Sequence, residues 1–310
     1  MLQRRHLTLL LTLWIFVTIS ACGSRQPAQP SALVDANLER VSRAAHMAFG
    51  KGAYEQAAGL YRDTLEYAYA RDDREIIVDT QYNLAIALLR QGALDEARAA
   101  VDSAKSELLW GSQAIPAHLQ LLEATLLFYT GQVTDAWDIS EQLLANVGGT
   151  EPGVLARLHF LRGLIAAERG DQQQLRTSLA ALETADSGAL DVDRAELRGR
   201  LEIAERNWGA AVEAFVTAAA LQQEALDYPN MVRALAMAGE ASIQMGNLRE
   251  ASLFFFRAGR SAARLDMANE ALQWLTQAEQ LAQDTGDTRM RTDIMTHLMA
   301  LQARVSRQSQ

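Results

Sequence analysis

The sequence predicts an all-α fold built as a repeat array. Alanine is abundant and Leu, Glu, Gln and Arg are frequent, whereas only 5 Pro and 19 Gly occur among 310 residues, a mixture that favours helix nearly throughout. A short sequence motif with a glycine near its start also recurs at a nearly constant spacing over about 200 residues. Such a period is typical of a solenoid, in which each unit buries its apolar face against its neighbours.

The first 21 residues have the layout of a bacterial export signal. Arg4 and Arg5 form a basic head, an apolar run extends from Leu7 to Ile19, and small residues precede Cys22. The apolar run is shorter than the about 20 residues that span a bilayer. We therefore expect residues 1–21 to be removed as a signal peptide, with an uncleaved membrane anchor as the alternative.

Residues 19–22, Ile-Ser-Ala-Cys, resemble the lipobox of bacterial lipoproteins. The resemblance implies that acyl chains such as palmitate are attached to Cys22, which becomes the first residue of the mature chain and anchors it to a membrane. Gly23 stands where an Asp would imply retention in the inner membrane, so the resemblance implies the outer membrane, with the protein facing the periplasm. The alternative is an ordinary secretory signal that ends near Cys22.

Cys22 is the only cysteine, so it has no partner for a disulfide within the chain. Residues 22–34 contain Pro27 and Pro30 and no helical period, which predicts a flexible tether. We expect the folded body to comprise six repeats over 35–265 and a capping helical hairpin over 266–310.

When the six expected repeats are aligned, three columns of the alignment hold the same kind of residue in nearly every repeat, at spacings of 36 to 40 residues along the chain. The turn column contains Gly52, Gly92, Gly131, Gly170, Arg206 and Gly246. Seven residues earlier stand the small residues Ala45, Ala85, Ala124, Gly163, Gly199 and Gly239. Five residues after the turn come Ala57, Ala97, Ala136, Leu175, Ala211 and Ala251. Small residues let two helices cross closely and glycine ends the first helix, so each unit is predicted to be a helix-turn-helix pair.

These units resemble tetratricopeptide repeats (TPRs), most clearly over residues 82–104 and 234–259. The resemblance implies a right-handed α-solenoid whose first helices line a concave groove. The sequence departs from the family in its periods of 36–40 rather than 34 residues and in having no proline that closes a unit. These departures indicate longer helices than in the standard repeat.

The last part of the chain shows two further amphipathic helices separated by Gly286. The first places Ala271, Trp274, Leu275, Ala278 and Leu281 on one face, and the second does so with Ile294, Leu298, Leu301 and Val305. We expect these helices to form the hairpin that caps the array.

Composition and motifs argue against catalysis and against nucleic-acid binding. The formal net charge is −9, and no run of Lys or Arg interrupts this acidic surface, which would repel phosphate groups. No HExxH, phosphate-loop or GxSxG motif is present. His118 and His159 lie on first helices of successive units, but packed or surface histidines explain them better than a metal site. We expect no enzyme activity, no cofactor and no metal.

The repeat register instead predicts a binding groove in the middle of the array. Its apolar part is expected to contain Tyr82, Leu121, Phe128, Tyr129 and Phe160, and its charged flanks Arg157, Arg200 and Arg233, with Asp79 and Glu196 nearby. Aromatic and arginine side chains dominate the binding energy of protein interfaces. The alternative is that several of these aromatic residues belong to the core between helices.

These features together favour a membrane-anchored scaffold that holds a protein partner of the bacterial cell envelope. Resemblance to outer-membrane TPR lipoproteins implies outer-membrane protein assembly, secretin or pilus biogenesis, or control of cell-wall enzymes. The alternative is a periplasmic carrier or sensor that binds an apolar or glycan ligand in the same groove. The sequence leaves the oligomeric state open.

Overall fold

A computed structural model describes residues 35–146, 151–185, 188–265 and 267–308. Within these ranges the chain forms fourteen α-helices and one short 3₁₀ helix, η1 (Gly188–Leu190), and no strand. The α-helices are α2 (Ala36–Gly50), α3 (Tyr54–Ala70), α4 (Arg74–Gln91), α5 (Leu94–Trp110), α6 (Ala117–Tyr129), α7 (Val133–Ala145), α8 (Pro152–Arg169), α9 (Gln172–Thr184), α10 (Asp191–Ala204), α11 (Trp208–Glu224), α12 (Tyr228–Gln244), α13 (Leu248–Ala262), α14 (Ala268–Asp284) and α15 (Thr288–Gln308).

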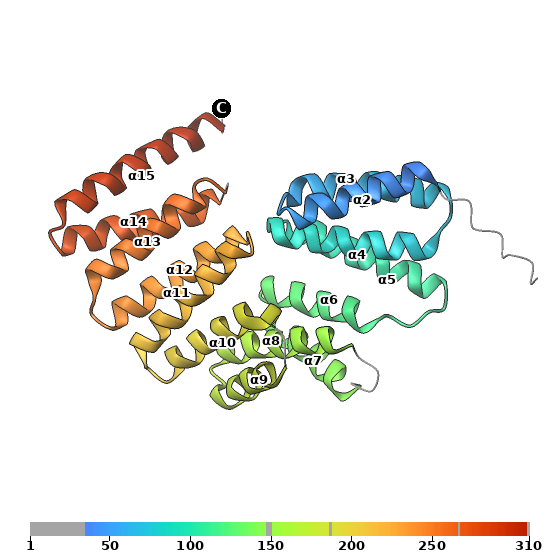
Figure 1. Cartoon of the computed structure of the whole chain (residues 1–310), viewed down its shortest axis with the longest axis horizontal. Coiled ribbons are helices and arrows are strands. Elements are labelled where there is room, and N and C mark those ends of the chain that lie inside the picture. Colours follow the sequence, from blue (N-terminus) through green and yellow to red (C-terminus); the bar gives the residue numbers. More distant parts are fainter. Residues whose placement is uncertain (1–34, 147–150, 186–187, 266, 309–310) are drawn as a thin grey trace, which may run out of the picture.

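Successive helices pack as antiparallel pairs, and the pairs stack into one curved array (Figure 1). Even-numbered helices are the first members of the pairs and odd-numbered helices the second. The predicted all-α solenoid is therefore confirmed, and its core runs along the array as a series of apolar clusters between neighbouring helices. The predicted signal peptide and the whole of the predicted tether, residues 22–34, lie outside the described residues.

The small residues of the sequence columns mark the crossing points of the helix pairs. All members of both columns, Leu175 included, are buried. A Cβ atom added to Gly199 would lie 2.8 Å from the ring of Phe215, and one added to Gly239 would lie 2.9 Å from the ring of Phe255. These phenylalanines fill the space that the missing side chains leave, so glycine is required for the close packing.

The turn column adopts the left-handed conformation at every position. The backbone φ angle is 73° at Gly52 and 81° at Gly92, for example, and Arg206 has the same conformation with φ 61°. A side chain in this conformation costs about 1 kcal/mol, so Arg206 is a mildly strained member of the column. The five glycines end their helices without this cost.

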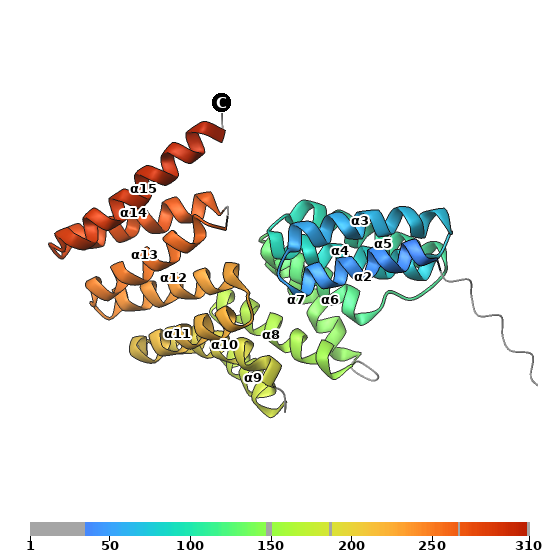
Figure 2. The same ribbon diagram turned by 45° about the horizontal axis from the view of Figure 1, so that its top comes forward.

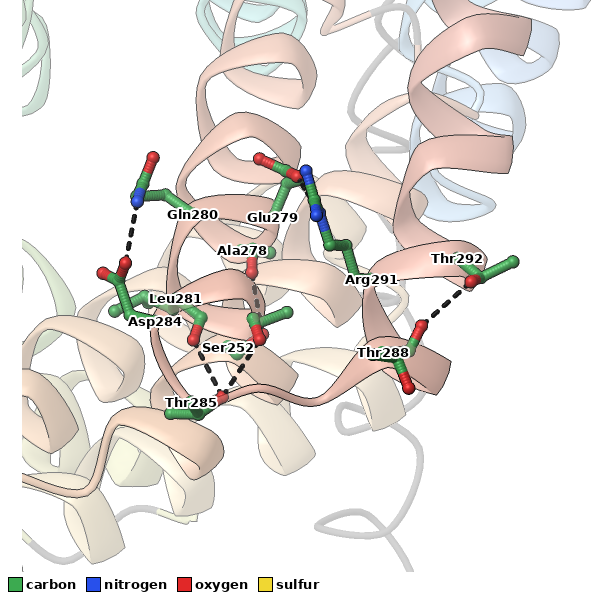
Figure 3. A network of polar contacts seen from close by, with 11 residues as sticks. Ser252, Ala278, Glu279, Gln280, Leu281, Asp284, Thr285, Thr288, Arg291 and Thr292 are labelled. Atoms are coloured by element: carbon green, nitrogen blue, oxygen red, sulfur yellow. Dashed lines mark hydrogen bonds and ion pairs between the residues drawn. The ribbon is translucent and has the colours of Figure 1, made fainter.

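The last pair, α14 and α15, has the same left-handed turn residue as the other pairs, but different residues lie where its two helices cross. Gly286 is left-handed like its counterparts, with φ 68°. Seven residues before it and five after it stand Glu279 and Arg291, where the other pairs have small or apolar residues, and Arg291 Nε donates to Glu279 Oε1 at 2.5 Å (Figure 3). An ion pair needs more room than two alanines, which accounts for the way α15 diverges from α14 in Figure 1.

One polar contact links α14 to α13, and a second closes the end of α14. The buried Ser252 hydroxyl of α13 donates to the carbonyl of Ala278 at 2.8 Å (Figure 3). The Thr285 hydroxyl, at the C-terminal end of α14, donates to the carbonyl of Leu281 in the same helix at 2.9 Å. The faces predicted for the hairpin are the packed ones, since Ala271, Trp274, Leu275, Ala278, Leu281, Ile294 and Leu301 are buried.

The curvature of the array brings its second and sixth pairs together. Arg90 at the end of α4 donates to Asp227 just before α12, with 2.5 Å between Nη1 and Oδ2. Beside this ion pair, a Cβ added to Gly52 would lie 3.6 Å from the backbone carbonyl of Leu226. In both views α12 points toward α4 across the opening of the curve (Figure 1; Figure 2). The array thus curves far enough to close on itself at this contact.

Candidate binding surface inside the superhelix

The first helices of the pairs turn their side chains toward the inside of this curve. Tyr129, the last residue of α6, is 48% exposed. Its pKa is nevertheless affected by the charges of Glu196 and Arg200 from α10, Arg233 from α12 and Arg90 from α4. Side chains from three other first helices therefore gather around one tyrosine of α6. We define the inner surface as Tyr129, Arg157, Asp193, Glu196, Arg200, Arg233 and Glu240.

Two tyrosines in this region, Tyr129 and Tyr82, have raised pKa values although both side chains are partly exposed. Burial is the main cause that raises the pKa of Tyr129, and the Glu196 carboxylate adds to it. Burial also raises the pKa of Tyr82, whereas the nearby Arg157 guanidinium lowers it. Charges facing one another across a narrow concave space interact more strongly than on an open surface.

The carboxylates of the inner surface show this effect most clearly. The pKa of Asp193 is raised from 3.8 to about 6, chiefly by burial and also by the neighbouring Glu196, while Arg157 and Arg90 oppose the increase. Burial likewise raises the pKa of Glu240, against the effect of Arg200. The inner surface therefore holds at least one carboxyl group, that of Asp193, that takes up a proton at mildly acidic pH.

The arginines differ in how far neighbouring carboxylates neutralise them. Arg200 is paired with Glu196, one turn away on α10, with 2.8 Å between Nη2 and Oε1. Arg233 lies 4.0 Å from Glu270. Arg157 is exposed and has no ion pair within the described ranges. Arg157 and Arg233 are thus the cations of this surface that remain most available to an acidic partner.

The predicted arginines and Tyr129 lie on the inner surface, but most of the predicted apolar residues do not. Leu121 is only 6% exposed and belongs to the core between α6, α7 and α8, so its assignment to the groove is wrong. Phe128 and Phe160 are half-buried and pack against neighbouring core clusters. Tyr82 is half-buried and meets the His118 ring edge-on, with 4.8 Å between ring centroids.

The prediction failed there because an aromatic residue on a first helix can face either the inner surface or the next helix. A shift of one residue turns a side chain by about 100° around the helix. The alternative that several of the aromatic residues belong to the interhelix core therefore holds for Phe128 and Phe160, which pack against core clusters.

Two acidic residues of the inner surface were missed, although the repeat register contains the signal for both. Asp193 stands six residues before the small residue of its helix, the same position that Arg157 and Arg233 occupy in theirs. Glu240 follows its small residue directly, as Arg200 does. A search by repeat position rather than by residue type would have found them.

The two histidines considered for a metal site have other surroundings. The His118 ring meets the Tyr82 ring edge-on, and burial together with the Arg162 charge lowers the pKa of His159. In the ranges that the structure covers, no cluster of three His, Cys, Asp or Glu side chains that could hold a metal ion occurs. No helix in those ranges is long and apolar enough to cross a bilayer. Cys22, the predicted lipid attachment site, lies outside them.

Comparison with solved structures identifies the class of fold. The chain superposes on a signal-transduction ATPase of the STAND type with a tetratricopeptide repeat sensor from Pyrococcus horikoshii, with a TM-score of 0.53 and 16% identity, covering 87% of this chain and 42% of that one. A tetratricopeptide repeat protein from Parabacteroides merdae matches with a TM-score of 0.45 and 14% identity, covering 84% of this chain and 98% of that one. No family model and no curated protein matches the sequence. The fold is thus a TPR-like α-solenoid, as the repeat columns predicted.

Proposed function

We propose that this protein is a non-catalytic scaffold that binds a protein partner on its inner surface. The observation that carries the proposal is the gathering of Arg200, Arg233 and Glu196 around the exposed Tyr129, with Arg157 beside the neighbouring Asp193. Tyrosine and arginine are the residue types that contribute most to protein interfaces. The mixture of both charge signs favours a partner segment that carries acidic and basic side chains in a complementary order.

The partner proposed here is a protein of the bacterial cell envelope, and the protein itself is proposed to be held at the outer membrane by a lipid on Cys22. The support is the sequence of the first 22 residues, with its basic head, its apolar run and its small residues before a single cysteine. The envelope process is proposed from resemblance alone and comprises outer-membrane protein assembly, secretin or pilus biogenesis, or regulation of cell-wall enzymes.

Site-specific photo-crosslinking in living cells tests the binding surface. A photoreactive amino acid replaces Tyr129, Arg157 or Arg233 in turn, and matched control positions are Arg98 on α5 and Glu213 on α11, which are exposed on second helices. We expect the inner positions to capture a protein that mass spectrometry identifies and the controls to remain uncoupled. Equal capture at both sets of positions, or capture at the controls alone, would contradict the proposal.

Metabolic labelling with a palmitate analogue tests the anchor separately. We expect the wild-type chain to carry the label and to sediment with membranes, and Cys22→Ser to lose both properties. A labelled Cys22→Ser chain, or an unlabelled wild-type chain, would contradict lipidation at this residue and would leave the crosslinking result unaffected.

A further inference from the structure

A second concave region lies outside the inner surface, where the turn between α11 and α12 meets α13 and α15. It is a cavity of about 410 Å³, which we call the arginine pocket. Its lining residues are Gln223, Tyr228, Met231, Arg260, Ser261, Arg264, Leu265 and His297. None of them belongs to the inner surface, so the partner site proposed above leaves this pocket unused.

The polar lining of the arginine pocket is rich in hydrogen-bond donors and positive charge. Arg260 lies in the last turn of α13, and Arg264 lies in the turn that follows this helix. Both are exposed, and neither has an ion pair with any residue of the described ranges. Tyr228, Ser261 and His297 add hydroxyl and imidazole groups, and none of the lining residues is acidic. Two unneutralised guanidinium groups therefore face one cavity on a chain whose net charge is −9.

Aromatic contacts hold two of these groups in place. The guanidinium of Arg260 lies over the Phe256 ring, 5.4 Å from its centroid, and the His297 ring meets the same ring edge-on at 5.4 Å. Phe256 itself is buried among the core residues of α13. Because a fixed ring positions both side chains, less conformational entropy is lost when they bind a ligand.

The remaining lining is apolar. Met231 at the start of α12 and Leu265 after α13 are partly buried and pack against the core cluster. A cavity of this volume, with an apolar part and a few convergent polar groups, has the character of a small-molecule site. A ligand would need an anionic group for the arginines and an apolar body for Met231 and Leu265.

We propose that the arginine pocket binds a phosphomonoester of a small apolar molecule. A phosphomonoester carries a charge of about −1.5 to −2 and three acceptor oxygens near neutral pH, which matches two guanidinium groups and the hydroxyl donors beside them. A carboxylate brings one charge and two oxygens and would leave one arginine unneutralised. Planar guanidinium groups also bind phosphate oxygens in pairs, which an ammonium group does not.

Calorimetric titration of the purified full-length protein with phenyl phosphate tests this proposal. We expect saturable binding with a Kd in the millimolar range or tighter, as is usual for a ligand of this size. The double variant Arg260→Gln/Arg264→Gln should weaken binding at least tenfold, and both residues are exposed, so the fold should not change. The matched control is Arg257→Gln, since Arg257 lies on α13 as Arg260 does, contacts the Phe254 ring at 5.9 Å and does not line the pocket.

Benzoate and inorganic phosphate provide the comparison ligands. The proposal predicts weaker binding of benzoate, which lacks the second charge, and of inorganic phosphate, which lacks the apolar body. Absence of saturable phenyl phosphate binding, or binding that the double variant and the Arg257→Gln control alter equally, would overturn the site. Benzoate binding as tightly as phenyl phosphate would overturn the phosphate preference, and inorganic phosphate doing so would overturn the role of Met231 and Leu265.

Discussion

Replacing Asp193 by asparagine tests the electrostatics of the inner surface. Burial and Glu196 raise the pKa of this carboxyl from 3.8 to about 6, so the folded protein binds its proton more tightly than the unfolded chain does. The stability linked to this proton is complete below about pH 4 and is lost as the pH rises through about 6. A difference of about two pKa units corresponds to about 3 kcal/mol, which we reduce to about 1–2 kcal/mol because the side chain is partly exposed.

We therefore expect Asp193→Asn to increase the free energy of unfolding by about 1–2 kcal/mol at pH 7 and to leave it unchanged near pH 4. Urea denaturation followed by circular dichroism at the two pH values measures this, with the transition midpoint as the readout because repeat arrays can unfold in parts. Asp138→Asn on α7 is the control, since Asp138 is exposed and has no ion pair within the described residues. Equal stabilisation at both pH values, or no stabilisation at pH 7, would refute the reasoning.

Two further predictions concern packing and closure. Gly239→Ala should destabilise the protein by about 1–2 kcal/mol in urea denaturation, because the overpacking cost against the Phe255 ring exceeds the gain of about 1 kcal/mol in helix propensity. Gly59→Ala is the control: no atom lies within 4 Å of the added Cβ, so this variant should stabilise the protein by about 0.5–1 kcal/mol. A change of the same sign in both variants would contradict the proposed close packing at Gly239. Arg90→Gln should increase the radius of gyration in small-angle X-ray scattering, and the reversed pair Arg90→Asp/Asp227→Arg should restore it; an unchanged radius in the single variant would contradict closure by this ion pair.

The repeat architecture could be predicted from the sequence because it depends on local contacts. Residues at fixed offsets from a turn, such as Ala85, Gly92 and Ala97, meet within one helix pair, so their spacing carries the geometry directly. The last pair could be predicted in part. Its apolar faces could be read from the sequence. The wider separation of α14 and α15 could not, because it depends on Glu279 and Arg291, which are neither small nor apolar and so do not fit the repeat pattern.

The closure of the superhelix could not be predicted in the same way. Arg90 and Asp227 are 137 residues apart, and their contact depends on the small rotations between all the intervening pairs. Which side chains lie on the inner surface depends on the same curvature. It also depends on the exact repeat register, because an error of one residue turns a side chain by about 100° around its helix. For this reason the arginines and Tyr129 were predicted, whereas Leu121 was placed on the wrong side of its helix.

The ion pair between Arg90 and Asp227 also has a kinetic consequence. When the two ends of a superhelical turn are joined, a partner has two routes to the interior, namely end-on insertion of a chain terminus and entry during a transient opening of the turn. A folded partner without a free terminus then associates at a rate set by how often the turn opens rather than by diffusion. Release requires the same opening, so a complex could persist for a long time although each of its contacts is weak.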